Sequence, residues 1–348
     1  MMNRRAWIKS SLGAGTALAL PAWVKTSLAQ PQAVQAVSGA QRSPAGQANQ
    51  ASPSSQAVQA SLGSLITRGI PSTGERLPII GLGSSATFAQ VARQEDHDAL
   101  KAVMATMVEL GGRVFDTAPS YGASEEVAGS IAKELGIAKQ LFWATKLNVA
   151  PRGVGKADPA VARKQIDQSF ARIGKPVIDL VQIHNMGDIP TQLPILQELK
   201  QSGKIRYIGV TTTFDSQYAE LIETMRRDKI DFIGTNYAID DRFAEQTILP
   251  LARERGIAVL VYAPFGRTRL WRRVAGRQVP EWAKEFDATT WAQFFLKFVA
   301  SHPDVTAITP ATSRVQNMAD NMAGGVGRLP DAAMRKRMIE LVESLPQS

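Results

Sequence analysis

Buried-strand patterns and amphipathic-helix patterns alternate along the chain from about residue 65 to its end. Short apolar runs end at Gly, Pro or polar residues, and longer stretches with apolar positions three and four residues apart follow them. The expected strands are 79–84, 113–116, 142–146, 180–184, 205–211, 231–237, 257–263 and 305–311. The expected helices are 95–110, 123–135, 157–173, 192–202, 215–228, 244–255, 288–301, 314–323 and a terminal helix at 331–345.

Eight strand–helix units in alternation predict a parallel sheet covered by helices. No G-x-G-x-x-G run follows any expected strand, so the fingerprint of a doubly wound dinucleotide-binding sheet is missing. A closed α/β TIM (β/α)8 barrel is therefore the expected fold, and one such barrel commonly takes about 250 residues. Ahead of it, Thr67–Ile70 and Leu77–Ile80 flank the turn Pro71–Gly74 and predict a hairpin.

The first segment of the chain has the order of an export signal. Residues 1–29 carry Arg4 and Arg5 before a weakly apolar run, Leu12–Val24, and end in small residues at Ala29. The arginine pair is typical of twin-arginine signals, which direct folded proteins to their own export machinery. An ordinary secretory signal or an uncleaved anchor is the alternative. The apolar run is short and interrupted by Gly and Pro, so no stable membrane span is expected after processing.

Residues 30–64 are rich in Gln, Ala, Ser, Pro and Gly, with almost no charge and no aromatic residue. Such a segment cannot bury enough apolar surface to offset the entropy lost on ordering. The predicted organisation is a signal peptide at 1–29, a disordered linker at 30–64 and the barrel at 65–348. A twin-arginine signal predicts that the mature protein is in the bacterial periplasm.

Composition narrows the chemistry. The chain has no cysteine, which excludes disulfides, thiol catalysis and cysteine metal sites, and its three histidines make a multi-histidine metal site unexpected. The formal net charge is +9, and residues 1–29 contribute four basic and no acidic residues, so +5 remains without them. No Lys/Arg run dominates the remainder, which favours a phosphorylated small ligand over nucleic acid.

Polar side chains end three consecutive expected strands. Asp116 ends one strand with Tyr121 on the loop beyond it, Lys146 ends the next, and His184 ends the third. Such strand ends meet at the catalytic face of a parallel barrel. A tyrosine with a pKa of about 10 is a poor acid at neutral pH, and an ammonium such as that of Lys146 lowers that pKa. Each residue alone would be a turn former, a solvated charge or a structural histidine, but the four together favour catalysis.

These four residues in their local contexts resemble the aldo/keto reductases, over nearly all of the chain from about Arg68. The resemblance implies a barrel whose floor is closed by the N-terminal hairpin, and an extra C-terminal helix. It implies that NADPH reduces a small aldehyde or ketone to an alcohol. Tyr121 would be the general acid, Lys146 would tune it, Asp116 would hold Lys146, and His184 would orient the carbonyl.

The resemblance also implies contacts to the nicotinamide. Tyr262 stands where an aromatic residue stacks on the ring, and Thr211 and Thr212 stand where a Ser-Asn pair often holds the carboxamide. Gly234 stands where a glutamine is usual. Asn236 lies two residues further on the same strand face, so it is expected to compensate.

The same resemblance implies contacts to the rest of the cofactor. At Gly83 and Ser84 the backbone is expected to approach the cofactor closely. The Arg-rich loop 264–282 is expected over the diphosphate, with Arg267 in contact. The helix start at 312–314 resembles the segment that holds the adenosine 2′-phosphate, and Asn321 matches an adenine contact. Within that segment the contacts are expected from Thr312, Ser313 and Arg314. Asn317 replaces an arginine often found there, so NADH stays open beside NADPH.

Two other functions are compatible with a nucleotide site on this fold. A nicotinamide-nucleotide-binding sensor or accessory subunit would keep the site with little turnover. A phosphosugar isomerase would need a glutamate base at a strand end, and no expected strand offers an obvious one. The substrate itself cannot be named, because variable loops build the pocket.

Overall fold

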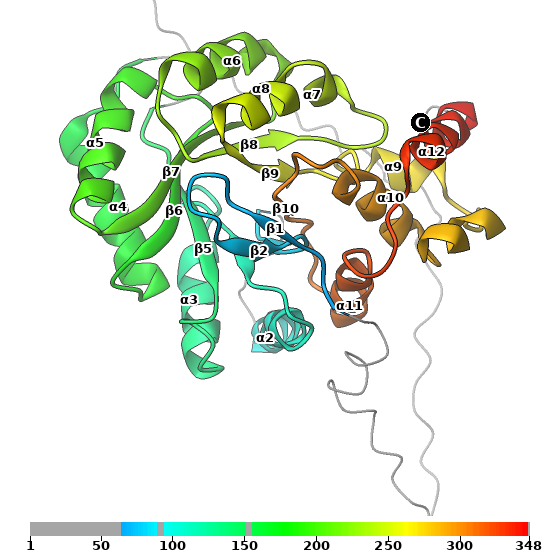
Figure 1. Ribbon diagram of the computed structural model, residues 1–348. Coiled ribbons are helices and arrows are strands. Elements are labelled where there is room, and N and C mark those ends of the chain that lie inside the picture. Colours follow the sequence, from blue (N-terminus) through cyan, green and yellow to red (C-terminus); the bar gives the residue numbers. More distant parts are fainter. Residues whose placement is uncertain (1–63, 86, 89–93, 151–154, 347–348) are drawn as a thin grey trace, which may run out of the picture. The chain divides into compact units, whose positions relative to one another are not determined.

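The computed structural model describes residues 64–85, 87–88, 94–150 and 155–346 (Figure 1). Within these residues eight strands form one sheet in chain order, and each strand pairs in parallel with the next. Their bounds are β3 Leu82–Gly83, β4 Val114–Asp116, β5 Phe142–Leu147, β6 Ile178–His184, β7 Ile205–Thr212, β8 Phe232–Asn236, β9 Ala258–Tyr262 and β10 Ala307–Ile308. The sheet curls into a nearly closed barrel, which confirms the predicted TIM fold.

A short seam between the first and last strands, β3 and β10, closes the barrel. Parallel bridges join Ile80 to Ile308 and Gly83 to Ala311. The backbones pack closely here, because a Cβ atom at Gly83 would lie 2.5 Å from the carbonyl oxygen of Thr309. Regular pairing covers only two residues of each strand, so both are shorter than the sequence pattern predicted.

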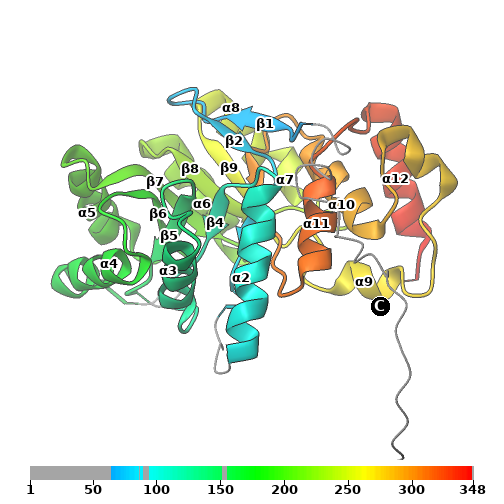
Figure 2. The same cartoon turned by 90° about the horizontal axis from the view of Figure 1, so that it is seen from below.

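Helices cover the outside of the barrel (Figure 2). Their bounds are α2 Gln94–Glu109, α3 Ser124–Glu134, α4 Pro159–Ile173, α5 Ile189–Gln201, α6 Tyr218–Arg227, α7 Phe243–Gln246, α8 Ile248–Arg255, α9 Arg269–Arg273, α10 Trp291–Ala300, α11 Val315–Ala323 and α12 Ala332–Ser344. Local signals fix their ends. At α4 the Asp158 carboxylate accepts the backbone N–H of Ala160 at 2.7 Å, Pro159 begins the helix, and Gly174 ends it with φ 73°.

Two regions differ from the prediction. The single helix expected at 244–255 is divided into α7 and α8, because Thr247 between them has φ −141°, outside the helical range. The loop expected at 264–282 contains the short helix α9 and leads into a 3-10 turn, Glu281–Phe286. The expected terminal helix is present as α12.

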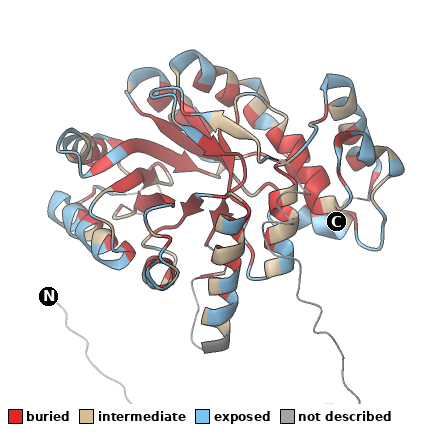
Figure 3. Cartoon of the chain, turned by 60° about the horizontal axis from the view of Figure 1, so that its bottom comes forward, coloured by how far each residue is buried: buried red, intermediate tan, exposed pale blue. Residues whose placement is uncertain are grey.

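The core lies inside the barrel and between the barrel and its helices, where most residues of the barrel strands are buried (Figure 3). The predicted hairpin pairs β1 Thr67–Gly69 with β2 Arg76–Pro78. Its Leu77 side chain packs with the inward-facing side chains of the barrel strands. Tyr207 on β7 donates to the Glu75 carboxylate of the hairpin at 2.7 Å. These contacts confirm that the hairpin closes the barrel floor.

The segments ahead of the barrel fall outside the described residues. This holds for the expected signal peptide 1–29 and, apart from Ser64, for the expected linker 30–64. In the part of the chain that is described, no helix combines the length and apolarity needed to span a bilayer.

Candidate active site

A cavity of about 940 Å³ opens at the carboxyl ends of the barrel strands. It contains all four of the predicted catalytic residues and several of the predicted cofactor positions. The residues from both groups that line it are Gly83, Ser84, Asp116, Tyr121, Lys146, His184, Thr211, Tyr262 and Arg267. Residues from six different strands or their following loops therefore meet at one site, which is what the barrel topology predicts.

A buried ion pair lies at the bottom of this site. The Lys146 ammonium donates to Oδ1 of Asp116 at 2.7 Å and to the carbonyl oxygen of Thr117 at 2.8 Å. Lys146 is 2% exposed and Asp116 is 4% exposed. Burial alone would lower the pKa of Lys146, but the Asp116 carboxylate and Tyr121 more than offset it and raise that pKa. The lysine therefore stays an ammonium.

Tyr121 lies next to this ammonium. The Lys146 Nζ atom is 5.0 Å from the centroid of the Tyr121 ring. Burial raises the pKa of Tyr121, and Lys146 lowers it by less, so the net direction is upward. Lys146 therefore acts in the predicted direction, but desolvation of the phenol outweighs the ammonium and leaves the pKa of Tyr121 above its usual value. The phenol keeps its proton, as a proton donor must.

His184 faces the same phenol from β6. Its ring stands edge-on to that of Tyr121, with centroids 5.7 Å apart and an interplanar angle of 79°. Its Nδ1 atom is 3.4 Å from the Ser120 hydroxyl. The imidazole is thus held beside the phenol and on the wall of the cavity, where it can meet a bound polar group.

Three cavity-lining residues that are not glycine have left-handed backbone conformations. Asn185, Ala263 and Arg267 have φ of 54°, 51° and 62°. Such conformations are uncommon outside glycine, cost about 1–3 kcal/mol each, and cluster at binding sites. They aim the loops that follow β6 and β9 at the cavity, and Arg267 is also bound through its guanidinium to the Thr213 hydroxyl at 2.8 Å.

A second cavity of about 470 Å³ adjoins the first and shares Phe265, Trp271 and Ala311 with it. Thr312 and Asn321, both predicted cofactor positions, line this second cavity.

The other two residues predicted for this end of the cofactor, Ser313 and Arg314, are exposed beside the start of α11 and do not line the cavity. The N-cap of α11 is Arg314, so Ser313 does not cap this helix. Among the described residues no side chain caps this helix, which leaves N–H groups for an anion.

Two predicted cofactor residues make contacts outside both cavities. The Thr212 hydroxyl donates to Gln217 at 2.6 Å and accepts the backbone N–H of Phe214 at 3.1 Å. The Asn236 amide accepts from the Tyr218 hydroxyl and donates to the Asp241 carboxylate at 2.5 Å. Asn236 therefore does not compensate for the glutamine that is usual at the position of Gly234.

Two residues that the sequence analysis did not single out belong to the site. Thr309 lines the main cavity, is 5% exposed, and has a hydroxyl without a hydrogen-bond partner in the described part of the chain. Gln182 on β6 donates to the Tyr262 hydroxyl at 2.9 Å. Gln182 lies two residues before His184 and therefore on the same strand face, a signal that the sequence does contain.

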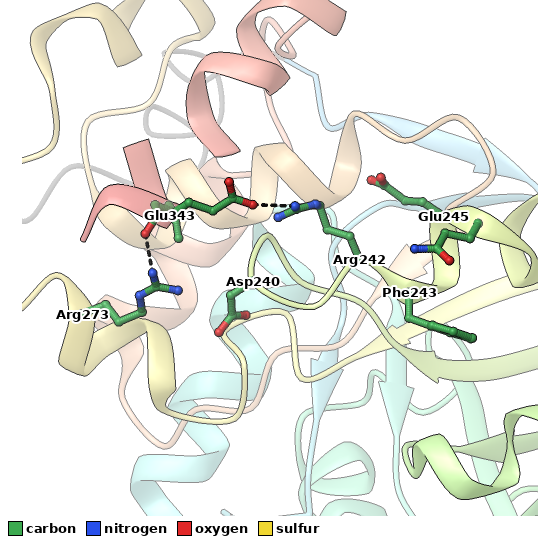
Figure 4. A pocket seen from close by; sticks show the side chains of 8 residues that line it. Asp240, Arg242, Phe243, Glu245, Arg273 and Glu343 are labelled. Carbon is green, nitrogen blue, oxygen red and sulfur yellow. Dashed lines mark hydrogen bonds and ion pairs between the residues drawn. The ribbon is translucent and has the colours of Figure 1, made fainter. Parts of the chain in front are cut away.

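A further cavity of about 490 Å³ involves α7, α9 and α12 (Figure 4). Arg242 pairs with Glu343 at 2.7 Å, and Arg273 donates to the carbonyl oxygen of Val342 at 2.5 Å. These arginines are thus used to join the C-terminal helix to the barrel helices. None of the predicted site residues lines this cavity.

Comparison with known proteins agrees with the fold. The model of the Aldo/keto reductase family matches residues 79–337. The aldo-keto reductase yakc [NADP(+)] of Schizosaccharomyces pombe is 25% identical over 299 residues, which are 75% of this chain and 88% of that protein. The NADH-specific methylglyoxal reductase of Escherichia coli is 30% identical over 237 residues, 61% of this chain and 71% of that protein.

A solved structure gives the same fold. The aldo-keto reductase from Klebsiella pneumoniae, crystallised in complex with NADPH, has a TM-score of 0.64 at 24% identity and covers 82% of this chain and 98% of its own. The predicted resemblance is therefore confirmed at the level of the family. The family model covers most of the barrel, the fold agrees, and the four predicted catalytic residues meet in one cavity, so the chain belongs to the aldo/keto reductase family.

Proposed function

We propose that the protein is an NADPH-dependent oxidoreductase that reduces an aldehyde or ketone to an alcohol, with Tyr121 as the general acid. The observation that carries the proposal is the meeting of Tyr121, Lys146, Asp116 and His184 in one cavity at the barrel mouth. Membership of the aldo/keto reductase family supports the reaction class.

The described residues fit a nicotinamide nucleotide. Two adjoining cavities provide an extended space, the buried Thr309 hydroxyl is a free partner for a polar ligand atom, and the start of α11 is uncapped. The bound cofactor supplies the hydride. Gly83, Ser84, Thr211, Tyr262, Thr309 and Arg267 would hold it in the main cavity, Thr312 and Asn321 in the second, and Ser313 and Arg314 beside α11.

The chain's own residues supply the proton and hold the carbonyl. Tyr121 carries its proton at neutral pH and gives it to the substrate oxygen, which becomes the alcohol oxygen. The phenolate that remains is stabilised by the Lys146 ammonium beside its ring. Asp116 keeps Lys146 charged and in place, and His184 donates a hydrogen bond that orients the carbonyl oxygen.

Replacement of Tyr121 tests this proposal. Tyr121→Phe should lower the rate of carbonyl reduction by about 10²–10⁴-fold, the usual contribution of general acid catalysis. NADPH binding, followed by fluorescence titration, should stay close to wild type because the ring is retained. Tyr207→Phe is the matched control, since it removes a buried hydroxyl at the barrel floor.

Two outcomes would contradict the proposal in different ways. Wild-type turnover by Tyr121→Phe would exclude Tyr121 as the acid. A wild-type protein that purifies with one nucleotide per chain, but turns over none of a panel of aldehydes and ketones, would instead identify a nucleotide sensor or accessory subunit.

A further inference from the structure

The Tyr262 side chain reaches from β9 to residues on two other strands. Its hydroxyl donates to Oδ2 of Asp116 at 3.0 Å and accepts from Nε2 of Gln182 at 2.9 Å. The direction of both bonds is fixed, because an amide nitrogen can only donate and a carboxylate can only accept. Asp116 is thus bound on both oxygens, by Lys146 on Oδ1 and by Tyr262 on Oδ2.

A glycine on β8 makes room for this tyrosine. A Cβ atom at Gly234 would lie 2.3 Å from Cε2 and 2.7 Å from the hydroxyl oxygen of Tyr262. Gly234 is not among the glycines with positive φ, so its backbone does not require glycine. The missing side chain is required by the tip of the Tyr262 ring.

We propose that Tyr262 is a positioning residue of the catalytic centre, whose hydroxyl fixes the Asp116–Lys146 ion pair against Tyr121, and that Gly234 is the space that admits it. This rests on the proposed function of Tyr121 as general acid. Stacking on a nicotinamide needs only the ring of Tyr262, so the role of the hydroxyl is a separate one.

The physical argument concerns a buried carboxylate. Without the phenol, Oδ2 of Asp116 would be a buried acceptor with no partner in the described part of the chain, and such groups are costly. The negative charge of Asp116 raises the pKa of Tyr121, and the ammonium of Lys146 lowers it. A hydrogen bond to Asp116 disperses that negative charge. Its removal should therefore make Tyr121 a weaker acid, with a higher pKa.

The other groups that face Tyr121 leave this direction unchanged. They are His184 from β6 and Arg267 from the loop after β9. The hydrogen bonds to the Asp116 carboxylate come from Lys146 and Tyr262. Burial holds the pKa of Tyr262 well above its usual value, so Tyr262 stays a neutral donor over the working pH range.

The test is Tyr262→Phe, which keeps the ring and removes the hydroxyl. It should lower kcat for carbonyl reduction about tenfold, the effect of losing a hydrogen bond to a charged group. The KM for the carbonyl and the Kd for NADPH should change little. The alkaline limb of the reduction pH profile should move upward by about one pH unit, because a weaker acid keeps its proton to higher pH.

Tyr207→Phe is again the matched control, since Tyr207 also donates to a carboxylate, at the opposite end of the barrel. It should melt at a lower temperature without moving the pH profile. Gly234→Ala is the second variant, because it keeps the hydroxyl but displaces the ring. It should give the same loss of kcat and the same upward shift as Tyr262→Phe.

The inference and the proposed function fail in distinguishable ways. If Tyr121→Phe is inactive while the pH profile of Tyr262→Phe coincides with wild type or moves downward, the role of the Tyr262 hydroxyl is overturned and the acid is not. If Tyr121→Phe is fully active, the proposed function falls. Ultraviolet titration of the phenols needs no substrate. The titration curve of Tyr262→Phe minus that of the Tyr121→Phe/Tyr262→Phe double variant gives the pKa of Tyr121 without the Tyr262 hydroxyl, and the curve of the wild type minus that of Tyr121→Phe gives it with the hydroxyl. Equal pKa values from the two differences would overturn the inference.

Discussion

At the scale of single residues, pairs on neighbouring strands decide which side chains reach the site. Thr211 and Thr212 are consecutive on β7, so their side chains point to opposite faces, and only Thr211 lines the cavity. Tyr262 on β9 is in register with Asn236 on β8, and its ring lies over Gly234 two residues earlier, where the missing side chain leaves room for it. Neither fact is visible from one position alone.

Arg314 offers a test of cofactor choice at this scale. It is exposed at the start of α11, so Arg314→Ala should leave the melting temperature unchanged. The Kd for NADPH should rise about tenfold to a hundredfold through loss of a charge-assisted contact. The Kd for NADH should change little, because NADH has no 2′-phosphate.

A matched charge change separates this contact from a general effect of basic charge. Arg277→Ala removes an exposed arginine from the loop before α10 and should weaken neither nucleotide. Equal weakening of NADPH and NADH by Arg314→Ala would show that Arg314 has another role.

The meeting of the four proposed catalytic residues in one cavity was predictable. Asp116, Lys146 and His184 lie at or near strand ends and Tyr121 lies on the loop after one, and strand ends are the best-defined points of a buried apolar run. Side-chain direction beyond a strand end was not predictable. Asn236 ends β8, and the following turn places Asp241 within hydrogen-bond distance of its amide. This hydrogen bond depends on a turn whose conformation the sequence pattern does not specify. The direction in which the pKa of Tyr121 is shifted was also not predictable, since it depends on how deeply the phenol is buried.

At the scale of elements, caps and periodicity predicted most of the helices within a few residues. The break at Thr247 was missed because no Gly or Pro marks it. Helix α9 was missed because five residues are too few for a helical period to show. The seam strands β3 and β10 were predicted too long, since apolar runs there continue past the paired residues.

Helix α10 contains a buried lysine that gives a testable pH dependence. Lys297 is 0% exposed, and its ammonium donates to the carbonyl oxygens of Val326 and Arg328. Burial lowers the pKa of Lys297 to about 8 from an ordinary value of 10.5. Between those pH values the unfolded chain holds a proton that the folded chain has released, so the free energy of unfolding should rise with pH.

Lys297→Met should remove this rise. The melting temperature of the wild type relative to the variant should increase from pH 8 to pH 10.5. Lys336→Met is the control, because Lys336 is 79% exposed and its replacement should leave the slope as in wild type. Parallel curves for wild type and Lys297→Met would mean that Lys297 titrates as it does in the unfolded chain.

At the scale of the whole molecule, we propose that residues 1–29 direct export of a folded, nucleotide-loaded barrel to the periplasm. Replacing both Arg4 and Arg5 with lysine should then trap the protein in the cytosol, since the twin-arginine machinery reads the guanidinium pair. Cell fractionation and immunoblotting measure this. The control variant replaces Lys9 and Lys25 with arginine. It keeps the total charge and the pair Arg4 and Arg5, so export should not change.

Export of the double-lysine variant would contradict this proposal. Processed double-lysine protein in the periplasm at normal yield would show that ordinary secretion suffices. In that case the chain would cross the membrane unfolded, and its nucleotide would have to be acquired outside the cytosol.

The seam between β3 and β10 has a consequence for the order of folding. Gly83 and Ser84 on one side of the seam and Thr309 on the other all line the main cavity, yet they come from opposite ends of the barrel sequence. Contacts between such distant segments cost the most loop-closure entropy. A growing chain on the ribosome lacks β10 until nearly all of the barrel has been made. The nucleotide pocket is therefore a property of the finished chain, and a truncated or half-synthesised barrel has no complete place to bind it.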